Sequence, residues 1–246
     1  MKKIFLFIAI ISIANNMETF AQNSVQPVIN TNTATAVTLS VDLFEAKINQ
    51  SPDAQIIDTR LPEEYAINHL INAININAQQ NDYEIEIGQL DKTKPVFTYA
   101  INAGRSTLLA NELIAKGFTE VYILKGGIGG WIGNGKPIYS SVKDNFTIDD
   151  FNKIIAANKV VLLDLHTRYC PACRKLQPTI DSVATENSDV KIIKIDVYDN
   201  PKIAGNFKAP ALPTVIVFKN GQNTWQQTGG DIQKTEIENA LSVSPK

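Results

Sequence analysis

Cysteine and histidine are scarce in this chain of 246 residues, which contains only two of each. A structural zinc site takes about four ligands, and the two histidines, His69 and His166, stand almost 100 residues apart. This shortage argues against a metal site. The two cysteines, Cys170 and Cys173, are separated by two residues. A disulfide that closes so short a loop stabilises a fold little, so a purely structural role for the pair is also disfavoured.

The chain has no excess of charge of either sign, with 23 Lys and Arg against 25 Asp and Glu. This mildly acidic balance argues against nucleic acid as a partner. The apolar run Ile4–Ala14 follows two lysines and is too short to span a bilayer, which takes about 20 apolar residues. With the small residues up to Ala21, it is typical of a secretory signal peptide. We expect cleavage near Ala21 and export to the periplasm; an uncleaved anchor is the alternative.

The two cysteines lie in the segment Tyr169-Cys170-Pro171-Ala172-Cys173, which follows the apolar run Val160–Leu163. This pattern predicts a buried strand that leads into a helix beginning at Pro171. Cys170 then stands at the helix N-terminus, where unpaired amides and the macrodipole stabilise a thiolate. Cys173 follows one turn later on nearly the same face. The sequence therefore predicts a redox-active dithiol in which Cys170 is the accessible nucleophile and Cys173 the shielded, resolving thiol.

Residues 143–246 resemble the thioredoxin family in several further features that occur at the expected offsets. These are Asp164, Pro178, Lys194, Leu212-Pro213-Thr214 and Gly229-Gly230. The resemblance implies a central mixed sheet flanked by helices, and a cis peptide bond before Pro213 that exposes the Leu212 backbone to an extended substrate. An ordinary loop proline is the alternative. The substrate-binding residues that the resemblance implies are Tyr169, Pro171, Leu212 and Pro213.

Two charged residues of this region have implied catalytic roles. Asp164 lies in an apolar run, where a buried carboxyl has a raised pKa and can exchange a proton with Cys173; a solvent-facing carboxylate is the alternative. Lys194 corresponds to the lysine that usually accompanies this acid, although a solvated lysine is equally consistent with the sequence. His166 replaces a large aromatic residue, and its imidazole either favours the thiolate of Cys170 or is a plain surface group.

From Val37 onward, expected strands alternate with expected helices, which predicts a parallel sheet with crossover helices. The expected strands are 53–58, 95–100 and 120–124, and the expected helices are 62–68 and 106–116. Residues 37–137 resemble a rhodanese domain. The motifs that carry this resemblance are Ile57-Asp58-Thr59-Arg60, Asn68-His69-Leu70 and Gly117–Trp131.

Active rhodaneses carry a cysteine directly after the central strand, and Ala100 occupies that position here. The resemblance therefore implies a domain without sulfurtransferase activity. Arg105 matches the family's arginine and could hold a small anion at the start of a helix; a vestigial arginine is the alternative. We expect His69 and Asp58 to have structural roles and Trp131 to lie in the core.

The predicted fold class is α/β, with a rhodanese-like parallel-sheet domain followed by a thioredoxin-fold domain. The expected division is a signal peptide (1–21), a flexible leader (22–36), an inactive rhodanese-like domain (37–137), a linker (138–142) and a thioredoxin domain (143–246).

The predicted function is thiol–disulfide exchange, most simply reduction, on extracytoplasmic disulfide-containing proteins, without metal or cofactor. A reductant in that compartment needs a membrane electron donor. Tyr169 and Pro171-Ala172 depart from the usual thioredoxin residues, so an oxidase or isomerase is an alternative. A second alternative is a binding module whose rhodanese-like domain docks a partner without turnover.

Overall fold

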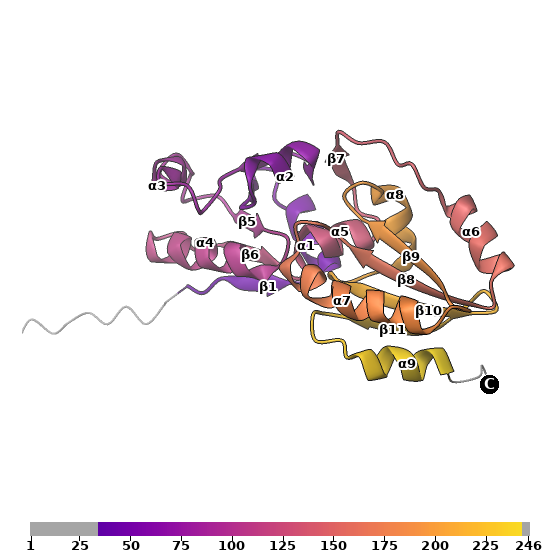
Figure 1. The fold of residues 1–246 in the computed structure, drawn as a ribbon. Coiled ribbons are helices and arrows are strands. Elements are labelled where there is room, and N and C mark those ends of the chain that lie inside the picture. The colour runs from indigo at the N-terminus through magenta and orange to yellow at the C-terminus, as the bar shows by residue number, and fades with distance from the viewer. Residues whose placement is uncertain (1–33, 243–246) are drawn as a thin grey trace, which may run out of the picture. The chain divides into compact units, whose positions relative to one another are not determined.

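The computed structural model describes residues 34–242, and Figure 1 shows the ribbon. The expected signal peptide and most of the expected leader lie outside the described residues. The N-terminal half contains a parallel sheet in the order β1-β6-β5-β2-β4. Its strands are β1 (Val37–Leu39), β2 (Gln55–Asp58), β4 (Ala73–Asn75), β5 (Val96–Tyr99) and β6 (Val121–Leu124). The parallel sheet confirms the fold class expected for this region.

Five helices accompany this sheet: α1 (Val41–Asn49), α2 (Pro62–Ile67), α3 (Tyr83–Ile87), α4 (Ala103–Ala115) and α5 (Gly127–Gly133). Local sequence explains where α4 begins and ends. Asn102 caps its N-terminus by accepting a hydrogen bond from the Gly104 amide at 3.3 Å, and Gly117 follows its end with φ of 94°, a conformation that favours glycine. Helix α5 is absent from the sequence-based prediction, because a run rich in glycine is typical of turns.

The C-terminal half contains a mixed sheet in the order β11-β10-β8-β9, with β8 and β9 parallel and the other pairs antiparallel. Its strands are β8 (Val160–His166), β9 (Lys191–Asp196), β10 (Thr214–Lys219) and β11 (Gln222–Thr228). The helices are α6 (Ile148–Ala157), α7 (Pro171–Glu186), α8 (Pro201–Ala204), a 3₁₀ turn (Gly205–Phe207) and α9 (Lys234–Ser242). This mixed sheet with its helices confirms the expected thioredoxin fold.

Strand β8 is one of the two inner strands of this sheet, since it pairs with both β9 and β10. Residues 161–165 are all buried, as the apolar run in the sequence predicts. Helix α6 begins at a capping box in which the Thr147 hydroxyl accepts from the Asp150 amide at 3.2 Å and the Asp150 carboxylate accepts from Thr147. Strand β8 ends at His166, three residues before Tyr169 of the cysteine motif.

The two halves belong to one compact unit that begins at Ala34. Residues 138–142, expected to form a linker, begin with strand β7 (Ile138–Ser140), which pairs antiparallel with β3 (Asn68–Leu70). One hydrophobic cluster contains side chains of both halves, among them Phe97, Ile128 and Trp131 together with Leu163, Cys170 and Leu212. The core thus continues from one half into the other.

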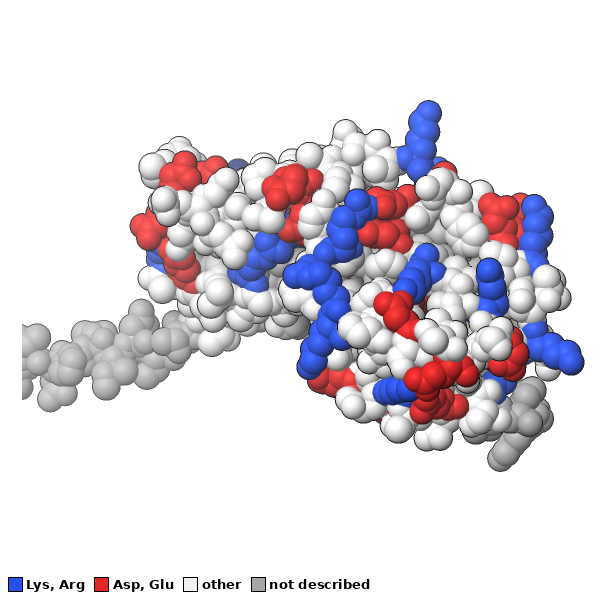
Figure 2. Space-filling model, viewed as in Figure 1, with Lys and Arg blue, Asp and Glu red and all other residues white. Residues whose placement is uncertain are grey.

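The surface carries acidic and basic side chains close together over much of the face shown in Figure 2, consistent with the balanced composition. Many of them form ion pairs, such as Lys136 with Asp42 and Glu45, both at 2.7 Å. Within residues 34–242, no helix has the length and apolar character needed to cross a membrane.

Candidate active site

The two thiols lie at the junction between β8 and α7. Cys170 is the N-cap of α7, with Pro171 at the first helical position, and its Sγ accepts a hydrogen bond from the Cys173 amide at 3.2 Å. The pKa of Cys170 is lowered, first by the hydrogen bond from the Cys173 side chain and then by the Cys173 and Ala172 amides and the charge of Arg174, while burial opposes the shift. The helix start thus stabilises a thiolate on Cys170, as its position in the sequence predicts.

Cys173 has the opposite electrostatic environment. Its pKa is raised far above the ordinary value, first because its thiol donates to Cys170, then because it is buried, and also because the negative charges of Cys170 and Asp164 are close. Both cysteines are free in the structure. The pair therefore contains one thiol that ionises readily and one that holds its proton, a division suited to sequential attack and resolution.

Asp164 lies in β8 with 3% of its surface exposed. Its partner in β9 is Lys194 and its partner in β10 is Val215. Burial raises the pKa of Asp164, against the charges of His166 and Lys194, which lower it. The charge of Asp164 also raises the pKa of Cys173, and the proposed exchange of a proton between the two groups stays a prediction.

Lys194 lies opposite Asp164 in β9, and His166 contacts the Asp164 carboxylate. The Lys194 ammonium binds the Asp181 carboxylate at 2.6 Å, and it acts on Asp164 only through its charge. His166 pairs with Asp164, with Nδ1 at 3.5 Å from Oδ2. The spacing of two residues along one strand puts Asp164 and His166 on the same face, so the sequence contained a signal for this pair.

The loop before β10 faces the dithiol. Its Leu212-Pro213 peptide bond is cis, and the Leu212 carbonyl oxygen lies 3.9 Å from Cys170 Sγ. On another side, a Cβ on Gly230 would lie 2.9 Å from the Cβ of Ala172, between the two cysteines. Of the expected substrate-binding residues, Leu212 contacts Cys170, Pro213 follows Leu212, and Pro171 follows Cys170 directly in the chain.

Tyr169, the fourth of these residues, stacks on Tyr198, which follows β9, with ring centroids 5.7 Å apart. The guanidinium of Arg60 lies over the ring of Tyr198, 5.2 Å from the ring centroid. Tyr198 is completely buried. A residue that the sequence did not single out thus connects the dithiol loop to the rhodanese-like half.

Exposure of the thiols differs from the prediction. Cys170 is 2% exposed and Cys173 is 5% exposed, so the expected accessible nucleophile is as buried as its partner. Both thiols belong to the cluster that also contains Ile128, Trp131 and Ile132 of the rhodanese-like half. The sequence could not show this, because the burial comes from packing between residues far apart in the chain.

The loop that carries the nucleophile in active rhodaneses is closed by internal contacts. Ala100 is fully buried, and its carbonyl oxygen accepts from the Ile128 amide at 2.9 Å. Arg105 donates to the Glu64 carboxylate at 3.3 Å, and this carboxylate competes with any anion for the guanidinium. Asp58 and Arg60 form a buried ion pair at 2.7 Å.

The remaining residues of this half that the sequence singled out are held by internal contacts. His69 stacks between the rings of Tyr65 and Tyr139, with centroids 3.9 and 4.6 Å away. Its Nδ1 lies 2.8 Å from the Tyr65 carbonyl oxygen. Trp131 is 5% exposed and donates from its indole nitrogen to the Pro137 carbonyl oxygen.

An Ala100→Cys variant is expected to gain no substantial thiosulfate sulfurtransferase activity. The new sulfur would be buried, Asn102 already binds the Gly104 amide, and the Arg105 charge is paired with Glu64. A persulfide needs free amides directed at its anionic sulfur. Thiocyanate formation from thiosulfate and cyanide checks the prediction, with Ala103→Cys as a control for a new thiol in the same loop. Turnover by the Ala100→Cys variant but not by the Ala103→Cys control would contradict the prediction, because it would show that the loop can still bind a persulfide.

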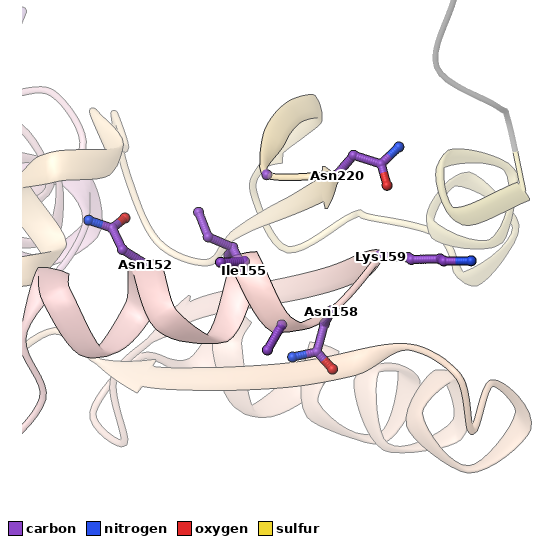
Figure 3. A pocket seen from close by; sticks show the side chains of 8 residues that line it. Asn152, Ile155, Asn158, Lys159 and Asn220 are labelled. Atoms are coloured by element: carbon purple, nitrogen blue, oxygen red, sulfur yellow. The ribbon is translucent and has the colours of Figure 1, made fainter.

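Two surface pockets lie away from the dithiol. The pocket in Figure 3, of about 600 Å³, is lined by residues such as Asn152, Lys159 and Asn220. Lys159 precedes β8 and Cys170 follows it, so they lie at opposite ends of a seven-residue strand, about 20 Å long. A second pocket, of about 1020 Å³, lies beside β7 and α8. Neither pocket contains a cysteine.

These features define a thiol–disulfide oxidoreductase: a low-pKa thiol at a helix N-terminus, a protonated resolving thiol, a buried acid and a cis-proline loop. Comparison with known proteins agrees. The Thioredoxin family model matches residues 142–243, and the Rhodanese-like domain model matches residues 40–134.

The relatives are also thioredoxins. A thioredoxin of Mycobacterium tuberculosis is 39% identical over 93 residues, which cover 37% of this chain and 80% of that protein. A thioredoxin of Porphyra purpurea is 32% identical over 91 residues, with 37% and 84% covered. The structure of mitochondrial thioredoxin 3 from Saccharomyces cerevisiae, in its oxidized form, covers 41% of this chain and 93% of its own, with 26% identity and a TM-score of 0.37. The chain belongs to the thioredoxin family and carries an N-terminal rhodanese-like domain.

Proposed function

We propose that the protein reduces disulfides of other proteins outside the cytoplasm. The observation that carries this proposal is the pairing of a Cys170 with lowered pKa and a Cys173 with raised pKa beside the buried Asp164. Such a pair can attack a substrate disulfide through Cys170 and resolve the mixed disulfide through Cys173 once a base accepts its proton, so it suits repeated thiol–disulfide exchange. The thioredoxin relatives support the same direction.

The reaction has two steps. The Cys170 thiolate attacks one sulfur of a substrate disulfide, forming a mixed disulfide and releasing the other sulfur as a thiolate, which takes up a proton. Cys173 then loses its proton and attacks Cys170, which frees the second substrate thiol. The substrate gains two electrons and two protons, and the protein is left with a Cys170–Cys173 disulfide.

Re-reduction requires a dithiol donor. The apolar N-terminal run that predicts export is the basis for placing the reaction in the periplasm, where disulfides persist and a soluble reductant cannot be assumed. The partner proposed for this step is a membrane protein that carries electrons across the bilayer and presents a dithiol to Cys170. Thiol–disulfide exchange between the two proteins then restores both thiols.

The reduction potential of the Cys170–Cys173 pair tests the proposed direction. Full-length protein is equilibrated in dithiothreitol or glutathione redox buffers, and the fraction oxidised is read after thiol trapping. We expect a value near that of thioredoxin, about −270 mV. A value above about −180 mV, in the range of isomerases and oxidants, would instead support the oxidase or isomerase alternative. A pair that exchanges with neither buffer under native conditions would support the binding module.

A further inference from the structure

Helix α5 of the rhodanese-like domain packs its backbone directly against the loop that precedes the cis-proline. Four glycines spaced as one face of a helix would each place a Cβ less than 3.0 Å from residues 209–212, and they are Gly126, Gly129, Gly130 and Gly133. A Cβ on Gly130, for example, would lie 2.3 Å from the Pro210 carbonyl oxygen. The close approach therefore depends on the absence of side chains.

Hydrogen bonds hold the same two segments together. The Ala209 amide donates to the Gly133 carbonyl oxygen at 2.9 Å. The Ala209 carbonyl oxygen accepts from the side-chain amide of Asn134 at 3.2 Å. Both backbone groups of Ala209 thus bind the C-terminal end of α5, in the way that an extended peptide would bind them.

Leu212 links this contact to the nucleophile. Its side chain would lie 2.8 Å from a Cβ on Gly129, so it packs on α5 itself, and its carbonyl oxygen lies 3.9 Å from Cys170 Sγ. Leu212 is 7% exposed and Cys170 is 2% exposed. A disulfide of another protein must bring a sulfur atom into contact with Cys170 Sγ, and this burial prevents it. Exchange therefore requires that the residues packed around Cys170 move.

On the basis of the proposed exchange at Cys170, we propose that residues 209–212 form an interaction surface that α5 occupies in the resting protein. A protein substrate reaches Cys170 by displacing α5. The partner that fits this surface is an extended chain segment next to a disulfide, since the surface offers the amide and carbonyl of Ala209. The rhodanese-like domain, which lacks a nucleophile of its own, then regulates access to the dithiol.

A Gly130→Ala variant of the full-length protein tests the proposal, because its methyl group cannot fit against Pro210 in the closed arrangement. Two rates are measured on the reduced protein: alkylation of Cys170, by mass spectrometry, and hydrogen exchange of the Ala209 amide, by NMR. Both report the same opening. We expect both to rise by the same factor, about tenfold or more.

The matched control is Gly104→Ala in α4, where the new Cβ meets only the Asn102 side chain at 3.6 Å; it should change neither rate. Asn134→Ala removes one hydrogen bond to Ala209 and should raise both rates less, which keeps the test valid if Gly130→Ala fails to fold. Wild-type Cys170 that is alkylated as fast as in urea-unfolded protein would overturn the proposal. So would folded Gly130→Ala and Asn134→Ala variants in which neither rate rises.

The same samples separate this proposal from the proposed function. If Gly130→Ala raises both rates but the variant reduces no protein disulfide, the result would support the proposal that α5 covers the surface of residues 209–212 and would refute the proposed reductase function. If the wild-type protein reduces protein disulfides while Cys170 is already fully accessible, the result would refute the proposal that α5 covers this surface and would support the proposed reductase function.

Discussion

A Cys173→Ala variant is expected to lose multiple turnover and to accumulate as a mixed disulfide between Cys170 and its substrate protein. Cys170 keeps its position at the start of α7, and the backbone amides of residues 172 and 173 still lower its pKa, so the first attack proceeds. The alanine has no thiol to complete the second step. Non-reducing electrophoresis followed by mass spectrometry measures the adduct and identifies the partner.

Removing the hydrogen bond from the Cys173 thiol, the largest cause of the low Cys170 pKa, makes this first attack slower than in the wild type. The control is Cys170→Ala, which should form no adduct because it has no thiol at the start of α7, and burial and the Asp164 charge still raise the pKa of Cys173. Equal adduct formation by Cys170→Ala would reverse the roles assigned to the two thiols. These two variants therefore test the division of labour separately from the direction of the reaction.

An Asp164→Asn variant is expected to slow resolution of the mixed disulfide by about 10²-fold, a typical contribution of general acid–base catalysis, while attack by Cys170 changes little. Cys173 is buried and holds its proton strongly, so a nearby base must accept that proton. Rapid-mixing experiments at neutral pH should show the mixed disulfide accumulating. Asp149→Asn, which alters an exposed carboxylate in α6, is the control. Unchanged rates of both steps would leave Asp164 without a catalytic role.

The same variant is expected to be more stable than the wild type at pH 7. Burial raises the pKa of Asp164 above 3.8, so the folded protein binds more protons than the unfolded chain between pH 3.8 and the raised value. Stability from this group therefore falls as pH rises through that interval. Urea unfolding should show that the difference in free energy of unfolding between the Asp164→Asn variant and the wild type is smaller at acidic pH than at pH 7. A variant that is more stable than the wild type but resolves the mixed disulfide more slowly would show that Asp164 serves catalysis and not the stability of the fold.

Much of the fold follows from local sequence patterns. The buried strand β8 follows from its apolar run, the start of α7 from Pro171, and the start of α6 from Thr147 and Asp150. The parallel N-terminal sheet follows from the alternation of apolar strands and amphipathic helices. In each case a pattern of residues near one another in the sequence predicts the element or the type of sheet.

The elements that the sequence did not reveal depend on contacts between distant segments. Helix α5 is stable because all seven of its residues are buried, although glycine disfavours helices. The regular spacing of its glycines was the available signal. Strand β7 forms in the expected linker because β3 offers a free edge. Lys194 binds Asp181 on α7, a pairing that its strand position alone could not predict.

A single-turnover reaction tests the central claim most directly. Reduced full-length protein is mixed with a cystine-containing protein without any electron donor, and substrate thiols and the Cys170–Cys173 disulfide are counted. We predict that each chain reduces one substrate disulfide and becomes oxidised at Cys170 and Cys173, while Cys170→Ser reduces none. Substrate that stays oxidised in the presence of folded, fully reduced wild-type and Gly130→Ala protein would contradict the account.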